Sequence, residues 1–338
     1  MTVSDANTPL IEVKDLGIRL NTSRGPAQAV RGVSFALRRG ETLGLVGESG
    51  CGKSITALAL MGLLPDSAVV SGSIRLEGSE LVGLPDASYC KLRGNRISMI
   101  FQEPMTALNP MHTIGRQVAE PLRRHTNCSA AQAHEQAIAL LDRVGLPDAA
   151  KRAEAYPHQF SGGQRQRVTI AMALACQPDV LIADEPTTAL DVTIQAQILD
   201  LLMRERRDNG MGLVLITHDM GVVAETADRV IVQYAGQQME MNATRAMFAD
   251  PHHPYTTALL AALPERANGR RLPAIPGVVP GPFDRPRGCV FSPRCAYVFD
   301  ACHDAEPPPA EPALGRARCL TPLVAAIPTA LALQEAAS

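Results

Sequence analysis

The chain has 338 residues, with 32 Lys and Arg against 34 Asp and Glu, so its formal net charge is −2. This near balance argues against a generally basic nucleic-acid-binding protein, and 4% aromatic residues with no Trp argue against a base-stacking platform. The length corresponds to about two domains of about 150 residues. No apolar run reaches the roughly 18–20 residues of a membrane-spanning helix, and the start lacks the features of a signal peptide. We therefore expect a cytosolic chain.

The spacing of apolar residues predicts an α/β protein with a helical insertion. Up to residue 101, apolar runs predict a strand pair over 10–37, strands over 42–47, 71–78 and 96–101, and a helix over 55–64. Residues 113–176 show helical spacing alone. Strands and helices then alternate again, with strands over 179–183, 212–217 and 229–234 and helices over 193–208 and 219–227. Past about residue 264, Pro and Gly crowd together, which predicts a loop-rich extension.

A glycine-rich segment follows the strand expected over 42–47. It reads GESGCGKS and matches the phosphate-binding loop G-x-x-x-x-G-K-[ST], with a strand before it and a helix after it. Glycines let the backbone approach phosphate oxygens, and the amides and the helix N-terminus face the anion. Lys53 would hold the β- and γ-phosphates, and Ser54 would bind Mg²⁺. The residues of this predicted phosphate loop are Gly47, Glu48, Ser49, Gly50, Cys51, Gly52, Lys53 and Ser54.

Two carboxylates end the apolar strand LIADE at residues 181–185. The carboxyl end of a strand is where α/β sheets place their ligands. Asp184 would hold Mg²⁺, directly or through water, and Glu185 is placed to take a proton from an attacking water. Together with the phosphate loop, these acids predict a site for magnesium and phosphate chemistry.

Four further short segments give the chain a resemblance to ABC-type ATPases. FSGGQ at 160–164 resembles the LSGGQ signature, with Phe in place of the usual Leu. Gln102 resembles the Q-loop glutamine, TALD at 188–191 the D-loop, and His218 the switch histidine. The resemblance covers roughly residues 10–240. It implies a P-loop ABC-type nucleotide-binding domain with an antiparallel β subdomain and a helical insert.

The resemblance also implies roles for these residues. Two subunits would dock head to tail, with ATP between the phosphate loop of one and the signature of the other. The signature residues that would contact this ATP are Ser161, Gly162, Gly163 and Gln164. Gln102 would contact Mg²⁺ and the attacking water, His218 would contact the γ-phosphate, and Asp191 would link the two sites across the dimer.

The chain departs from the family where adenine binds. ABC ATPases stack adenine on an aromatic residue ahead of the second strand, but residues 20–30 contain no aromatic residue. Leu20, Arg24 or a residue of a partner would have to cover the base. Arg24 could do so by cation–π stacking.

Longer segments narrow the resemblance to the ATP-binding subunits of bacterial dipeptide and oligopeptide importers. They lie at 99–110, 156–168, 183–199, 253–265 and 276–295. The subfamily implies a heterodimer with a second ABC ATPase, two integral-membrane permease subunits and an extracytoplasmic binding protein, at the cytoplasmic face of the bacterial inner membrane. A face of the helical insert near Gln102 would receive the coupling helices of the permease, and no nucleic acid is expected.

The organisation and the cargo follow from the same resemblance. We expect an ABC ATPase domain over 8–264, with its helical subdomain at about 113–177, then an extension over 265–322 and a tail over 323–338. Relatives that carry nickel, glutathione or haem leave the cargo open. A soluble ABC ATPase without a transport role is a further alternative, although such proteins usually carry two cassettes or a long coiled coil. The importer-type extension argues against an efflux ATPase.

Four of the eight cysteines lie in the expected extension, at Cys289, Cys295, Cys302 and Cys319. In a reducing compartment such a group favours a metal site over disulfides. Four thiolates in a Pro- and Gly-rich segment suit tetrahedral Zn²⁺ or an iron–sulfur cluster, and unligated thiols or disulfides are the other interpretations. The resemblance implies a [4Fe–4S] cluster with a structural or regulatory role. His303 could be a spare ligand or simply a solvated loop residue.

Overall fold

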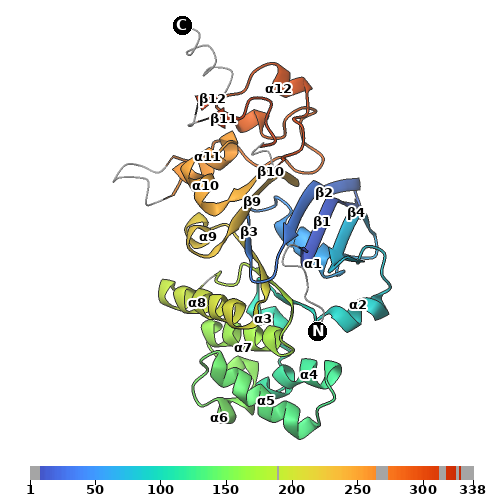
Figure 1. The fold of residues 1–338 in the computed structure, drawn as a ribbon, viewed down its shortest axis with the longest axis vertical. Coiled ribbons are helices and arrows are strands. Elements are labelled where there is room, and N and C mark those ends of the chain that lie inside the picture. Colours follow the sequence, from blue (N-terminus) through green and yellow to red (C-terminus); the bar gives the residue numbers. More distant parts are fainter. Residues whose placement is uncertain (1–7, 189, 264–272, 312–316, 325–326, 329–338) are drawn as a thin grey trace. The chain divides into compact units, whose positions relative to one another are not determined.

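The computed structural model describes residues 8–188, 190–263, 273–311, 317–324 and 327–328. Its internal contacts divide the chain into two compact units. The first unit consists of Met1–Ile11, Leu37–Glu41 and Leu76–Ile216, and the second of Glu12–Ala36, Thr42–Arg75 and Thr217–Ser338. Each unit is therefore assembled from segments that are far apart in the sequence (Figure 1).

The second unit begins with a β subdomain. Strands β2 (Gly25–Leu37), β1 (Ile11–Thr22) and β4 (Ala68–Leu76) are neighbours in one sheet. Only two residues separate β1 from β2, so the pair is a hairpin, which must be antiparallel. In β2 the side chains of Val33 and Phe35 are buried while Ser34 is half-buried, as the alternating pattern predicts.

A second group of strands in this unit includes the strand that leads into the phosphate loop. Strand β3 (Thr42–Val46) pairs in parallel with β9 (Arg229–Tyr234), which pairs antiparallel with β10 (Gln237–Ala243). Every residue of β3 is buried, which explains its continuous apolar character. Four helices complete this part of the unit: α1 (Lys53–Leu60), α9 (Met220–Thr226), α10 (Thr244–Ala249) and α11 (Pro254–Ala261).

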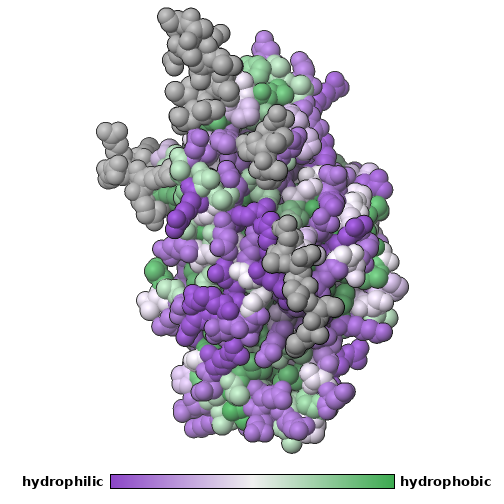
Figure 2. Space-filling view, viewed as in Figure 1, coloured by the Kyte–Doolittle hydropathy of each residue, from purple (hydrophilic) through white to green (hydrophobic). Residues whose placement is uncertain are grey.

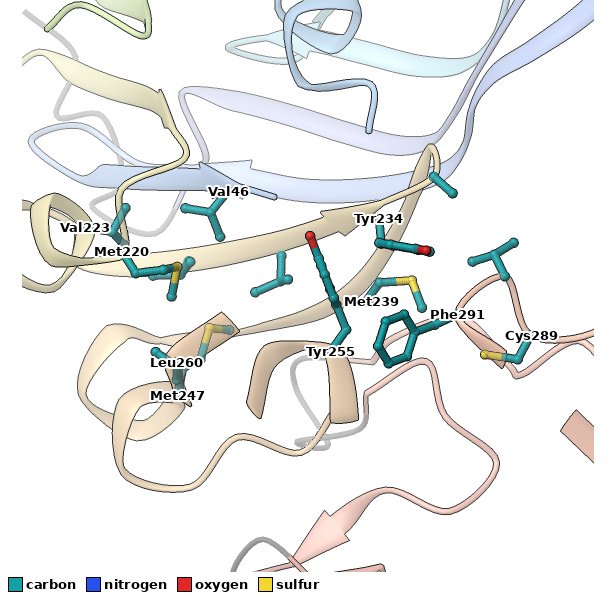
Figure 3. Close-up of a cluster of buried hydrophobic side chains, with 14 of the residues drawn as sticks. Val46, Met220, Val223, Tyr234, Met239, Met247, Tyr255, Leu260, Cys289 and Phe291 are labelled. Carbon is teal, nitrogen blue, oxygen red and sulfur yellow. The ribbon is translucent and has the colours of Figure 1, made fainter. Parts of the chain in front are cut away.

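A buried cluster joins the strands of the second unit to its C-terminal segments. It includes Val46 from β3, Tyr234 from β9, Tyr255 from α11 and Phe291 from the extension. Figure 3 shows the rings of Tyr234, Tyr255 and Phe291 close together, with Cys289 on the far side of Phe291. Large aromatic side chains bury most of the apolar area in such a contact, so this cluster attaches the extension to the strands.

The first unit combines parallel strands with the helical insertion. Strands β6 (Ile97–Ile100) and β8 (Gly212–Thr217) flank β7 (Val180–Asp184), and β7 pairs in parallel with both. Residues 113–176 are described throughout and contain helices and turns only, as predicted. The helices of the insertion are α4 (Ile114–His125), α5 (Ala130–Arg143), α6 (Ala149–Ala153), the 3₁₀ turn η1 (Pro157–Gln159) and α7 (Gly162–Leu174).

The remaining elements of the first unit are short except for one helix. They are β5 (Ser79–Glu80), α2 (Asp86–Leu92), α3 (Pro104–Ala107) and α8 (Val192–Asn209). The predicted helix over 193–208 is thus confirmed as α8. The helix predicted over 55–64 instead runs from Lys53 to Leu60. Gly52, in the left-handed conformation, caps its start two residues earlier than apolar spacing suggests.

The loop-rich extension is also confirmed. In its described residues, 273–311 and 317–322, it has the 3₁₀ turn η3 (Ser292–Arg294) and the short helix α12 (Ala301–Asp304). The expected tail contains the two-residue strands β11 (Leu323–Val324) and β12 (Ile327–Pro328). Residues 325–326 and 329–338 of that tail lie outside the described residues. The sequence patterns missed β10, α10 and α11, since short elements give little periodicity.

In the part of the chain that the structure describes, no helix is both long and apolar enough to cross a membrane. On the face drawn in Figure 2, hydrophobic residues form small areas between hydrophilic ones.

Candidate nucleotide site and cysteine pocket

The predicted phosphate loop lies between β3 and α1, as the motif requires. Gly47 has a φ of 149°, and a Cβ there would lie 2.1 Å from the carbonyl oxygen of Gln233. Gly52 has a φ of 100° and leads into the first turn of α1. Side chains at these two positions would collide or be strained, so the wrapped backbone depends on glycine.

Lys53 is only 6% exposed, at the first turn of α1. Its Nζ donates to the carbonyl oxygens of Gly47 at 2.8 Å and Glu48 at 3.2 Å. The ammonium group is therefore held against the backbone of the loop. Cys51 is buried beside it, and burial raises the pKa of its thiol. Its small side chain thus serves packing.

Two residues outside the motif contact the loop through Glu48. The Glu48 N–H donates to the hydroxyl of Tyr255 at 2.9 Å. The Glu48 carboxylate accepts two bonds from the guanidinium of Arg294, at 2.6 Å and 3.0 Å. Neither Tyr255 nor Arg294 belongs to a short motif, so the sequence alone does not reveal these contacts.

The acidic pair lies in the first unit at the end of β7. Asp184 is the last residue of the strand and is 3% exposed. Glu185 has a φ of 47°, an unusual conformation for a non-glycine residue, and its N–H donates to Ile216 O at 2.9 Å. Because of this turn, the carboxylates of Asp184 and Glu185 point in directions that a continuing strand would not give them.

One oxygen of Glu185 accepts two hydrogen bonds. Gln102 Nε2 donates to Glu185 Oε2 at 3.1 Å, and Thr188 Oγ1 donates to the same oxygen at 2.9 Å. These two donors fix the orientation of the carboxylate. The structure thus brings together two residues predicted to act in catalysis, Gln102 and Glu185, and adds Thr188.

The signature segment and the D-loop aspartate also come together in the first unit. Ser161 caps α7 and forms a capping box with Gln164. Asp191 caps α8 and accepts from Ile194 N at 2.9 Å. Both segments line one hollow of about 540 Å³. Its lining residues include Ser161, Gly162, Gly163, Gln164, Arg167 and Asp191. The N-terminus of α7 and Arg167 favour an anion in this hollow, whereas the Asp191 carboxylate at the start of α8 opposes one.

His218 belongs to the second unit, with the phosphate loop. It is exposed and follows the last residue of β8. The next residue, Asp219, caps α9 by accepting from Gly221 N at 2.8 Å. The predicted site residues therefore form two groups, one in each unit.

The structure places the ring of Phe283 beside Arg24, although residues 20–30 themselves contain no aromatic residue. Arg24, in the β1–β2 turn, holds its guanidinium carbon 4.8 Å from the ring centroid of Phe283. Both side chains belong to the second unit, and Phe283 comes from the extension. Because Phe283 lies far from segment 20–30 in the sequence, the sequence alone does not predict a ring at this place.

All four cysteines of the extension line one small cavity. Cys289 N–H donates to Cys302 O at 2.8 Å, which brings two of the cysteine-bearing segments together. Burial raises the pKa of Cys295 to about 11 and that of Cys319 to about 12, and the neighbouring cysteines add to both shifts. The thiols of Cys295 and Cys319 are therefore protonated at neutral pH, and a metal would have to displace these protons.

His253 lines the same cavity, whereas the candidate spare ligand His303 is exposed. His253 is 1% exposed, and burial lowers its pKa to about 3. Its Nδ1 caps α11 by accepting from Tyr255 N at 3.0 Å. The ring is thus neutral and is held at the cavity wall.

The four cysteines are suitable donors for a thiolate-bound metal group, but the cavity between them is too small to hold a cluster as it stands. Four cysteines are the donors of structural zinc and of iron–sulfur clusters. Among the described residues, however, no three His, Cys, Asp or Glu side chains are placed to hold a metal ion. The cavity of about 20 Å³ has room for about one water molecule, so a cluster would require the thiols to move apart.

Comparison with known proteins agrees with this geometry. A profile described as "ABC transporter" matches residues 30–188, and one described as "Oligopeptide/dipeptide transporter, C-terminal region" matches residues 239–302. The oligopeptide transport ATP-binding protein OppD of Escherichia coli is 50% identical over 93% of this chain and 94% of its own length. The dipeptide transport ATP-binding protein DppD of the same organism is 48% identical over 88% and 92%.

A solved structure shows the same fold. The ATP-binding cassette MJ0796, in a dimeric post-hydrolysis state bound to ADP and Pi, aligns with a TM-score of 0.63 and 28% identity. The alignment covers 70% of this chain and 99% of MJ0796. The resemblance inferred from the sequence is thereby confirmed. The chain belongs to the family of ABC transporter ATP-binding subunits that includes DppD and OppD.

Proposed function

We propose that this chain binds and hydrolyses MgATP and that hydrolysis powers the uptake of dipeptides and oligopeptides through a membrane permease. The observation that carries the hydrolysis is the bonded group of Gln102, Thr188 and Glu185 at the end of β7, and the similarity to DppD and OppD carries the peptide uptake. Family membership and the phosphate loop support it.

In this proposal each group of residues has one task. The amides of residues 47–54 and the ammonium of Lys53 would bind the phosphates, and Ser54, Gln102 and Asp184 would hold Mg²⁺. Glu185 accepts a proton from the attacking water, which Gln102 helps to position. His218 contacts the γ-phosphate.

Two such subunits would enclose ATP head to tail. The hollow lined by residues 161–164 and Asp191 is the surface that would receive the phosphates bound by a partner. A second ABC ATPase in a heterodimer is the expected partner. MJ0796, which has this fold, is described as dimeric in its solved structure.

The permease would dock on the helical insertion at the cytoplasmic face of the bacterial inner membrane. The sequence predicts a face near Gln102; the structure offers a groove of about 720 Å³ between α4 and the residues around Gly94, and Gln102 is not among its lining residues. Its charged and titratable lining is mostly basic: Arg93, His112, Arg116, Glu120, Arg123, Arg124 and His125. This charge favours a coupling helix with acidic side chains. An extracytoplasmic binding protein would complete the importer.

The Arg24–Phe283 pair would provide the surface that covers adenine. The pair is exposed, and it offers both an aromatic face and a guanidinium plane. The extension would thereby replace the aromatic residue that segment 20–30 lacks.

The four cysteines of the cavity would hold a [4Fe–4S] cluster, with zinc as the alternative. When bound, such a group would crosslink loops that bury little core of their own, a structural or regulatory role.

The test is a transport assay with the assembled importer in vesicles. Lys53→Ala should abolish tight ATP binding and peptide uptake together, because it removes the charge held against the phosphate loop. Uptake that persists in this variant would refute the proposal. Recovery of ribosomes instead of membrane proteins in a pull-down would favour the soluble, non-transport alternative.

A further inference from the structure

The strongest contact between the extension and the phosphate loop is the ion pair of Arg294 with Glu48. Arg294 Nη1 lies 2.6 Å from Glu48 Oε2, and Nη2 lies 3.0 Å from Oε1, so the pair is bidentate. The arginine side chain is 3% exposed and the glutamate side chain 31% exposed. A bidentate pair of this kind is among the strong, geometrically specific polar contacts.

The remaining donors of Arg294 are bonded as well. Nε donates to Pro276 O at 2.7 Å, Nη2 to Ile275 O at 3.2 Å, and Nη1 to Tyr234 Oη at 3.3 Å. All five N–H groups of the guanidinium therefore have a partner. The side chain is held by the extension and by β9, so it cannot follow Glu48 if the loop moves.

Tyr255 contacts the same residue of the loop from α11. Its hydroxyl accepts from Glu48 N–H at 2.9 Å, so side chain and backbone of Glu48 are both held. The Tyr255 ring is fully buried, 4.7 Å from the ring of Tyr234 and 5.3 Å from that of Phe291. In Figure 3 these three rings form one group beside Cys289.

Glu48 occupies a sensitive position in the loop. Its carbonyl and that of Gly47 accept from Lys53 Nζ, so the backbone that Arg294 and Tyr255 hold is the backbone that places the lysine. We propose that Arg294 and Tyr255 are positioning residues, which form a strut that fixes Glu48 and lets the C-terminal extension set the affinity of the phosphate loop for nucleotide.

The strut ends at the cysteine pocket. Arg294 directly precedes Cys295, and Phe291 belongs both to the ring group and to the wall of the pocket. An ordered pocket would therefore hold the phosphate loop in place through the side chains of Arg294 and Tyr255. This inference rests on the proposed binding of ATP at residues 47–54.

The chain offers a matched control in Arg318. It is also a buried arginine of the extension, with a side chain 5% exposed against 3% for that of Arg294, and it also precedes a cysteine of the pocket. Its partners are Gln238 O and Glu306. We expect Arg294→Met to raise the ATP Kd and KM about tenfold with a smaller change in kcat. Arg318→Met should change the ATP Kd less than about twofold.

Two conservative variants distinguish a direct effect on ATP binding from a loss of folding. Arg294→Lys should recover part of the affinity, and Tyr255→Phe, which keeps the ring, should raise the ATP Kd about threefold. In a double-mutant cycle, Glu48→Gln and Arg294→Met should be strongly non-additive. The thermal unfolding midpoint of every variant is measured alongside.

Equal effects of Arg294→Met and Arg318→Met on the ATP Kd would overturn the strut, and so would additive effects in the cycle. Failure of the underlying function looks different. If Lys53→Ala still bound ATP tightly, the proposed role of the phosphate loop would fail. If Lys53→Ala lost ATP while Arg294→Met bound it normally, only the strut would fail.

Discussion

The amide of Gln102 donates to the carboxylate of Glu185 over 3.1 Å. These residues are 83 positions apart, and they come together because β6 and β7 are parallel neighbours whose carboxyl ends meet at one edge. The side chain of Gln102, just after β6, therefore contacts the carboxylate of Glu185, just after β7, directly. Any movement of the segment that carries Gln102 would change the setting of Glu185.

Replacing Glu185 by Gln should stop turnover while ATP still binds. The substitution keeps the shape and removes the proton acceptor, so phosphate release should fall at least about 100-fold. The ATP Kd, measured by equilibrium dialysis, should change little. Thr188→Val, which removes one donor to Glu185, is the milder comparison. Unchanged phosphate release in Glu185→Gln would show that another group accepts the proton.

The signature serine can be separated from an ordinary helix cap. Ser161 and Ser129 form the same capping box, each with a glutamine three residues later, at the starts of α7 and α5. Changing either to Ala should lower the free energy of unfolding by about 1 kcal/mol. Only Ser161 lines the hollow shared with Asp191, so only Ser161→Ala should also lower ATP turnover. Equal losses of turnover would mean that the signature acts through stability alone.

The cysteine pocket should bind iron and sulfide. Protein purified without oxygen should contain about four iron and four sulfide per chain. Cys302→Ser should lose this content, whereas Cys176→Ser, outside the pocket, should retain it. One zinc per chain without sulfide would support the alternative, and the absence of any metal would refute a metal site.

A charge network in the first unit should give the protein an acid-sensitive component. Arg39 and then Arg96, each 2.6 Å from a Glu77 oxygen, hold the pKa of Glu77 below its ordinary value of 4.5. The folded state therefore resists protonation of Glu77. This contribution is present above about pH 4.5 and is lost as the pH falls through the lowered pKa.

Glu77→Gln should accordingly lower the free energy of unfolding at pH 7 by less than about 1 kcal/mol, since the group is well solvated. The difference between variant and parent should shrink at low pH, as measured by urea denaturation. A constant difference at every pH would contradict the assignment.

The groove on the helical insertion should be needed for assembly. Reversing the charges of Arg116 and Arg124 should reduce co-purification with the permease several-fold, while ATP binding by the isolated subunit persists. Arg204→Glu, on α8 and paired with Asp200 outside the groove, is the control for general charge effects. Normal assembly of the Arg116 and Arg124 variant would place the docking surface elsewhere.

Much of this site could be read from the chain because its chemistry is local. The glycines at 47, 50 and 52 and Lys53 act within one turn, and strand ends such as Asp184 follow from continuous apolar runs. The same holds for Ser161 and Asp191, which cap the helices that follow them. For Lys53, Ser161 and Asp191 the partner of the side chain lies within a few residues, so spacing alone is informative.

Contacts between residues far apart in the sequence could not be predicted from the spacing of residue types. Glu48 meets Tyr255 across 207 positions and Arg294 across 246, and Arg24 meets Phe283. An arginine in a Pro- and Gly-rich segment has no periodicity that reveals its partner. The sequence by itself determined the family, the strand and helix pattern and the position of the phosphate-loop motif between β3 and α1. Only the tertiary structure decided which side chains of the extension reach the phosphate loop, because burial and packing select partners that chain order does not.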